Sequence, residues 1–207
     1  MTDTRVLFAC VWATALMVAG GCGSASTPVQ DNAAPVAPQP HTIKTLPPSS
    51  HVTGLPYPPR CVIETSNGHA LPDVSCTPGA VTSGVTQANM HSTICKTGWT
   101  ATVRAPESET GPVKKTAITS YSETALSSTA IELDHLVPLE LGGSNDTANL
   151  WPEPSDLPGQ GFRNTKDNVE NDMRKAVCSG KVSLSAAQTA ISNNWGTAEA
   201  TVGIGGH

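Results

Sequence analysis

An Asp-His pair followed by an Asn is the part of this sequence whose residue types and spacing could do chemistry. Asp134 and His135 close an apolar run, and Asn149 follows beyond a Gly-Gly turn. A carboxylate oxygen suits a hard divalent cation, and an imidazole accepts a proton near neutral pH. Asn149 can hold the imidazole or its loop in place. The pattern therefore predicts a metal ligand beside a general base, as in metal-assisted hydrolysis of a phosphodiester.

The segment from Ile131 to Pro154, IELDHLVPLELGGSNDTANLWPEP, resembles the HNH endonuclease family. The resemblance is carried by Asp134-His135, Pro138-Leu139, Gly142-Gly143 and Asn149-Leu150. A wider region, from about Leu71 to Trp195, resembles small exported HNH-like proteins through LPDVSCTPG, TICKTGWTATVR and KDNVEN. The resemblance implies an α+β fold whose core is a β-hairpin plus a helix around one metal ion, the ββα-metal core. It also implies endonuclease activity, with His135 as the catalytic base and Asn149 as the supporting residue that orients its loop.

Each of the two motif residues also has a purely structural interpretation. His135 is the one histidine inside a motif; the others are His41, His51, His69, His91 and His207. A structural imidazole beside an Asp is the alternative to a catalytic one. Neighbouring residues of a strand point to opposite faces unless the strand ends or bulges there, so Asp134 could instead cap the turn.

The family's third position, a His or Asn near the start of the following helix, has no His here. Oxygen ligands near that position are offered by Asn164, Asp167, Glu170 and Asn171. Asp167 is the preferred metal ligand beside Asp134, and Asn171, one helical turn later, is the second choice. These oxygen ligands favour Mg²⁺ or Mn²⁺. The alternative for the helix residues is a solvated face.

The charge balance gives no strong signal for nucleic-acid binding. Asp and Glu total 17 against 12 Lys and Arg, a formal net charge of -5. Binding of nucleic acid, with DNA expected and without sequence specificity, would then depend on a local patch and on salt. Arg163 and Lys166 are the expected phosphate contacts. The acidic balance and the missing third His also favour a second hypothesis, a catalytically silent HNH-fold module that binds or supports the cell envelope.

The N-terminal sixty residues indicate export and a tether. Residues 1–22 hold Arg5, an apolar run and small residues before Cys22, as in a lipoprotein signal peptide that would place a lipid on Cys22 and the protein at a membrane. Secretion after ordinary cleavage and a retained anchor are the alternatives. Residues 23–60 are rich in Pro, Ser, Thr and Ala, which predicts a disordered tether.

Residues 61–207 are long enough for one domain. Its cysteines are Cys61, Cys76, Cys95 and Cys178, an even number in a chain that reads as exported. Two disulfides are expected, with all three connectivities open. The spacing lacks the paired C-x-x-C pattern of a structural zinc site.

The apolar periodicity predicts the elements that must position the motif. Helices are expected over 114–126, 166–178 and 183–194, the last capped by Ser183. A strand over 131–139, a turn at 142–143 and a returning strand over 148–151 form the expected hairpin, with prolines ending it. Short strands, including 93–95 and 99–103, are expected before residue 121, with a short helix over 83–89 as an alternative there.

Overall fold

The hairpin predicted around the motif is present, although its strands end at other residues than those predicted. The structure is a computed structural model that describes residues 42–122 and 130–205. Strand β5 (Ile131–His135) pairs antiparallel with β6 (Leu150–Pro154), so that His135 lies opposite Leu150. The strand expected to reach residue 139 ends at 135. The returning strand runs past Pro152 to Pro154, because each strand of a two-stranded sheet is an edge that tolerates missing N–H groups.

The segment between β5 and β6 carries two short 3₁₀ turns, Leu139–Leu141 and Thr147–Asn149. Asn149 is fully buried and closes this segment: Oδ1 accepts from the backbone N–H groups of Ala80 and Val137, at 3.2 and 3.0 Å. Its Nδ2 donates to the carbonyl oxygens of Val137 and Ser144, both at 2.9 Å. Gly143 packs so closely that a Cβ there would lie 1.8 Å from the Val137 carbonyl oxygen. The Gly at this turn is therefore a packing requirement.

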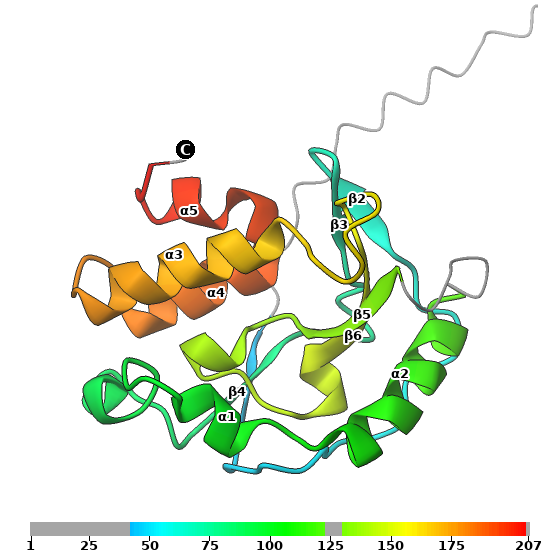
Figure 1. Ribbon diagram of the computed structural model, residues 1–207, viewed down its shortest axis with the longest axis horizontal. Coiled ribbons are helices and arrows are strands. Elements are labelled where there is room, and N and C mark those ends of the chain that lie inside the picture. Colours follow the sequence, from blue (N-terminus) through cyan, green and yellow to red (C-terminus); the bar gives the residue numbers. More distant parts are fainter. Residues whose placement is uncertain (1–41, 123–129, 206–207) are drawn as a thin grey trace, which may run out of the picture. The chain divides into compact units, whose positions relative to one another are not determined.

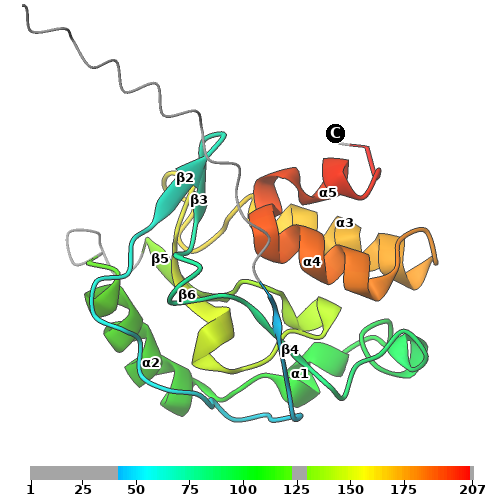
Figure 2. The same ribbon diagram turned by 180° about the vertical axis from the view of Figure 1, so that it is seen from behind.

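Helix α3 (Lys166–Cys178) matches its predicted range, and α4 (Leu184–Asn194) is capped as predicted, since Ser183 Oγ accepts from the Ala186 N–H. The two helices lie side by side, and α5 (Ala198–Thr201) follows the 3₁₀ turn Trp195–Thr197 (Figures 1 and 2). Met173, Val177 and Ile191 are among the residues of the main core that these helices form. The buried face of α3 also includes Lys166 and Glu170.

Helix α2 (Glu107–Ser120) packs on β5 and β6 and begins earlier than predicted. Pro112 is the sixth residue of α2, beyond the N–H groups that lack helical acceptors, so the helix forgoes the hydrogen bond that another residue would make there. The end of the predicted helix, residues 123–126, lies outside the described residues. Ala117 and Tyr121 belong to a second apolar cluster, to which the hairpin contributes Trp151 of β6.

Several elements before α2 differ from those predicted. Residues 93–95 follow a 3₁₀ turn, Met90–Ser92, and residues 99–103 form α1 (Trp99–Val103), not strands. Residues 83–89 form turns rather than a helix. The strands present are short: β2 (Glu64–Ser66) pairs antiparallel with β3 (His69–Leu71), and β4 (Ala80–Thr82) pairs parallel with β1 (Lys44–Leu46). The fold is mixed helix and strand with small sheets, as the α+β assignment expected.

The predicted tether, residues 23–60, extends too far along the chain. Within the described part, β1 pairs with β4, and Thr53 Oγ1 donates to Asp146 at 2.9 Å. Tyr57 is 8% exposed and donates to the Leu150 carbonyl oxygen at 2.9 Å. Composition did not reveal this folded segment, because its apolar content is low. The segment is held by backbone pairing and by one buried ring, that of Tyr57. The signal segment and Cys22 lie outside the described residues. Within residues 42–122 and 130–205, no helix is long and apolar enough to cross a membrane.

Two disulfides are present, as predicted, and they join Cys61 to Cys76 and Cys95 to Cys178. The pairs are separated by 15 and 83 residues in the sequence. The second ties the turns before α1 to the end of α3. Two such bonds are typical of proteins that fold in an oxidising, extracytoplasmic compartment.

We expect the long-range disulfide to stabilise the fold more than the short-range one. Replacing both Cys95 and Cys178 with Ser should lower the free energy of unfolding by about 2–4 kcal/mol, because a longer loop loses more entropy when it is closed. The matched control replaces Cys61 and Cys76 with Ser. Urea unfolding of both variants measures the difference, and an equal or larger loss in the control would contradict this expectation.

Candidate active site

His135 is held by an asparagine that the sequence pattern did not single out. Its Nε2 lies 3.0 Å from Asn145 Oδ1. The amide of Asn145 cannot turn over, because its Nδ2 donates to the carbonyl oxygens of Ser49 at 2.9 Å and Val103 at 2.7 Å. Oδ1 can only accept, so Nε2 carries the proton of the neutral ring. The lone pair of Nδ1 is then the one that can take a proton.

The environment of His135 keeps its ring neutral. Burial lowers the pKa of His135 to about 4. The charge of Asp134 and the hydrogen bond that the ring donates to Asn145 oppose this shift, and Arg104 lowers the pKa further. The side chain is 7% exposed. A ring that stays neutral at pH 7 keeps a lone pair for a proton, and its lowered pKa makes it a weaker base than an ordinary imidazole. The signal for Asn145 in the sequence was only its place in SNDTAN, between the turn and Asn149.

Asp134 points to a different set of partners, on α3. Lys166 Nζ donates to Asp134 Oδ2 at 2.6 Å, to the His135 carbonyl oxygen at 2.9 Å and to Glu170 Oε1. Lys166 is 1% exposed. Burial alone would lower its pKa, but Asp134, Glu170 and Glu153 outweigh burial and raise it. Lys166 is therefore a permanently charged, buried ammonium and not the exposed phosphate contact that the sequence predicted.

A third carboxyl group completes the cluster around Lys166. Glu153 on β6 is 3% exposed, and burial followed by the charge of Asp134 raises its pKa well above the ordinary value. The raised pKa favours the protonated form of Glu153, which can share its proton in a hydrogen bond with Asp134. Burial would raise the pKa of Asp134 itself, yet the charge and hydrogen bond of Lys166 lower it. Asp134 is thus the ionised partner of Lys166.

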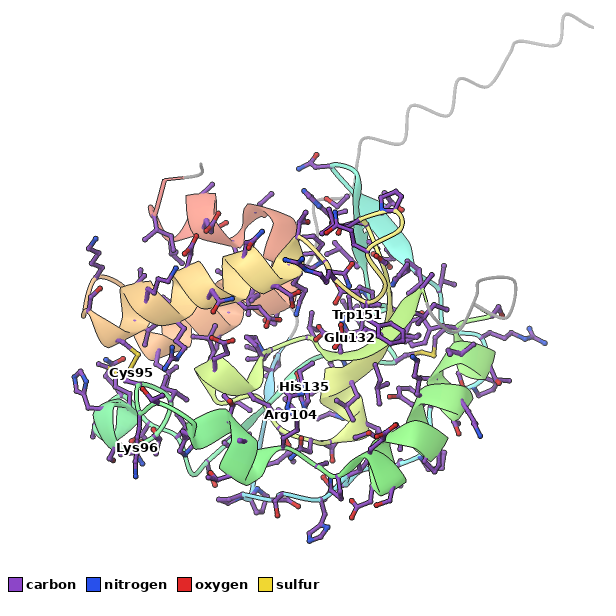
Figure 3. The ribbon with its side chains drawn as sticks, in the orientation of Figure 1. Cys95, Lys96, Arg104, Glu132, His135 and Trp151 are labelled. Carbon is purple, nitrogen blue, oxygen red and sulfur yellow. A yellow bond between two sulfur atoms is a disulfide. The ribbon has the colours of Figure 1, made fainter. Side chains whose placement is uncertain are left out.

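Further charged side chains surround His135 and the cluster. Figure 3 shows His135 between Glu132 of β5 and Arg104, which directly follows α1. Burial, then Asp134 and Asp167, raise the pKa of Glu132 to about 7, while Lys166 and Arg104 oppose them. Arg104 is exposed and acts electrostatically on both Glu132 and His135. Arg104 is thus an exposed cation whose charge acts on the candidate base.

The predicted site residues divide into three groups. Hydrogen bonds through Lys166 bring Asp134 and the His135 backbone together with α3. Asp167 is exposed at the start of α3 and acts electrostatically on Glu132, whereas Asn171 donates to the Asp167 carbonyl oxygen at 2.7 Å. Arg163 is exposed, and within the described ranges no hydrogen bond joins its side chain or that of Asn171 to Asp134 or His135. Asn149 acts on the backbone of the loop, as a supporting residue would.

The predicted metal ligands do not fit a divalent ion as they are arranged. Asp134 Oδ2 accepts a hydrogen bond from the Lys166 ammonium, and the pKa of Asp134 also reflects a hydrogen bond with Glu153. No group of three His, Cys, Asp or Glu side chains in residues 42–122 and 130–205 could hold a metal ion.

Comparison of the chain with protein-family models, with curated proteins and with solved structures finds no match. The geometry of His135, Asn145 and the Lys166 cluster is thus the basis for assigning a function.

We expect the buried, neutral ring of His135 to make the protein sensitive to acid. The pKa is about 4 in the folded chain against 6.5 when unfolded, so the unfolded chain binds more protons between these values. Stability from this ring is fully present above pH 6.5 and is lost as the pH falls toward 4, by at most about 3 kcal/mol.

Urea unfolding of the wild type and of His135→Gln at pH 7, 6 and 5 measures this dependence. The difference between the two proteins cancels the carboxyl groups, which titrate in both. The advantage of the wild type should shrink on acidification. A difference that stays constant from pH 7 to pH 5 would contradict the lowered pKa.

Proposed function

We propose that this chain is a nuclease that hydrolyses phosphodiester bonds of nucleic acid, with His135 as the general base. The observation that supports it most is the hydrogen bond from His135 Nε2 to Asn145 Oδ1, which leaves the Nδ1 lone pair open on a ring that is neutral at pH 7. A water molecule that gives its proton to Nδ1 attacks phosphorus, and the bond from phosphorus to the leaving oxygen breaks. The leaving oxygen takes up a proton from solvent.

Arg104 supplies the positive charge for the substrate in this proposal. It is exposed and influences His135 electrostatically, which suits a side chain that binds the phosphate beside the base. The formal net charge of -5 leaves little other attraction for a polyanion. Binding is therefore expected to be weak, to depend on salt and to ignore sequence, with DNA as the expected substrate.

An exported location agrees with the proposed activity. The two disulfides are typical of exported proteins. We propose a lipid anchor at Cys22, on the resemblance of residues 1–22 to a lipoprotein signal, with release as a secreted protein as the alternative. Mass spectrometry of the chain purified from membranes of the producing cell would detect acylation of Cys22.

A second candidate function is a catalytically silent module of the cell envelope. The observation that favours it is the pairing of Asp134 with the buried Lys166, because a carboxylate held in this way serves the packing of α3 on the hairpin. Such a module would keep the fold and bind a partner without turnover. The two candidates differ in whether nucleic acid is cut.

The test is cleavage of linear DNA, plasmid DNA and RNA by the full chain with its disulfides intact, at low salt, with Mg²⁺, Mn²⁺ or a chelator. We expect cutting by the wild type and at least a hundredfold slower cutting by His135→Ala. His91→Ala is the matched control, because His91 is exposed on the turn before α1. Equal cutting by all three proteins would indicate a contaminant, and no cutting by a folded wild type would favour the silent module.

A further inference from the structure

We propose that the Lys166 ammonium occupies the place of the divalent cation, so that Asp134 binds neither Mg²⁺ nor Mn²⁺ in this protein. The HNH resemblance implies a metal ion between the strand-end carboxylate and the following helix. In this protein, Asp134 and helix α3 are joined by Lys166, a side chain of that helix. The proposal deepens the proposed nuclease function by defining its cation, but it concerns binding and holds whether or not nucleic acid is cut.

Every N–H donor of the Lys166 ammonium has an acceptor. An ammonium has three N–H donors, and Nζ has three oxygen partners, on Asp134, Glu170 and the His135 backbone. The contacts with Asp134 and with the His135 carbonyl oxygen are 2.6 and 2.9 Å long. Lys166 therefore binds a set of oxygen atoms from β5 and α3 much as a small cation would.

Displacement of Lys166 by a metal ion would be costly. Lys166 is the first residue of α3 and is 1% exposed, so its ammonium is shielded from bulk solvent. A divalent ion placed at Asp134 would stand beside that ammonium, and like charges in a buried site repel strongly.

The arrangement also changes how charge is balanced in the site. One ammonium and one ionised carboxylate, Lys166 and Asp134, already compensate each other. A divalent ion needs uncompensated oxygen ligands, and of the remaining nearby carboxyl groups Glu170 already accepts from Lys166, while Glu153 is buried on β6. The site thus carries a permanent cation that belongs to the chain, and any hydrolysis should proceed in the presence of a chelator.

Direct binding of Mn²⁺ tests the proposal without any substrate. Electron paramagnetic resonance of the full chain titrated with Mn²⁺, together with thermal unfolding with and without the ion, compares the wild type with Lys166→Ser, Asp134→Asn and Lys175→Ser. Lys175→Ser is the matched control, because it removes an exposed ion pair with Asp172 from the same helix. The wild type and the control should bind no stoichiometric Mn²⁺.

In Lys166→Ser, the freed carboxylates of Asp134 and Glu170 should gain Mn²⁺ binding, so that the ion raises the unfolding temperature of this variant alone. One equivalent of Mn²⁺ bound to the wild type and lost in Asp134→Asn would overturn the proposal, and this comparison stands even if Lys166→Ser does not fold. A folded Lys166→Ser that gains no binding would also overturn it. Absence of cleavage would count against the nuclease function and leave the binding result unchanged.

Discussion

Lys166→Met is expected to lower the free energy of unfolding by about 3–5 kcal/mol, because it leaves buried carboxyl groups without their cation. The methionine side chain fills a similar volume, so the loss comes from charge and not from a cavity. Asp134 would remain ionised or take up a proton at a cost, and the His135 carbonyl oxygen would lose a donor. Urea unfolding at pH 7 measures the change.

Two further variants separate the buried charge from a general effect on α3. Lys175→Met, which breaks the exposed pair with Asp172, should change stability by no more than about 0.5 kcal/mol. Adding Asp134→Asn and Glu170→Gln to Lys166→Met removes the uncompensated charge and should recover much of the loss. If Lys166→Met were as stable as Lys175→Met, the cluster would not be the buried ion pair described.

Asn149→Ala is expected to cost about 3–5 kcal/mol, through the loop that carries the candidate base. Its amide makes four hydrogen bonds to backbone groups of β4 and of the segment between β5 and β6. Alanine would leave these buried donors and acceptors unpaired, and each unpaired group costs about 1–3 kcal/mol before the structure relaxes. The hydrogen bonds of the Val137 N–H group and of the Val137 carbonyl oxygen would be lost together.

The matched control for this variant is Asn168→Ala, since Asn168 is exposed on α3. Its effect on stability should stay within about 0.5 kcal/mol. Chemical unfolding gives both values, and amide hydrogen exchange should show Val137 and Ala80 losing protection in Asn149→Ala. Retained protection at these two amides would argue that Asn149 does not hold the loop.

The sequence was most informative where the apolar pattern itself determines the structure. The apolar side chains of α3 repeat at helical spacing up to Val177, and α4 follows a serine cap, so both helices could be predicted to the residue. The end of β5 at His135 was not predicted, because the apolar residues up to Leu139 extended the expected strand. The two disulfides followed from an even number of cysteines, but their pairing depended on contacts between distant turns and α3.

The parts that could not be predicted depend on pairing between distant segments. Lys166 and Glu170 read as an exposed face because charged side chains are rarely buried, and only the carboxyl groups of the hairpin reverse that expectation. Trp99–Val103 is rich in strand-forming residues yet forms α1. Asn145 gains its role from the carbonyl oxygens of Ser49 and Val103, which lie far from it in the sequence.

The contact between Asn145 and the Ser49 carbonyl oxygen bears on where the protein can be shortened. A fragment that begins at Cys61, the boundary that composition suggests, would lack β1, Tyr57 and this acceptor. Its Asn145 amide would keep the Val103 carbonyl oxygen as its one remaining backbone acceptor of the two, so the tautomer of the imidazole would be held by fewer contacts. Proteolytic trimming before Cys61 would therefore weaken the support of the candidate base, although the cut lies far from His135 in the sequence.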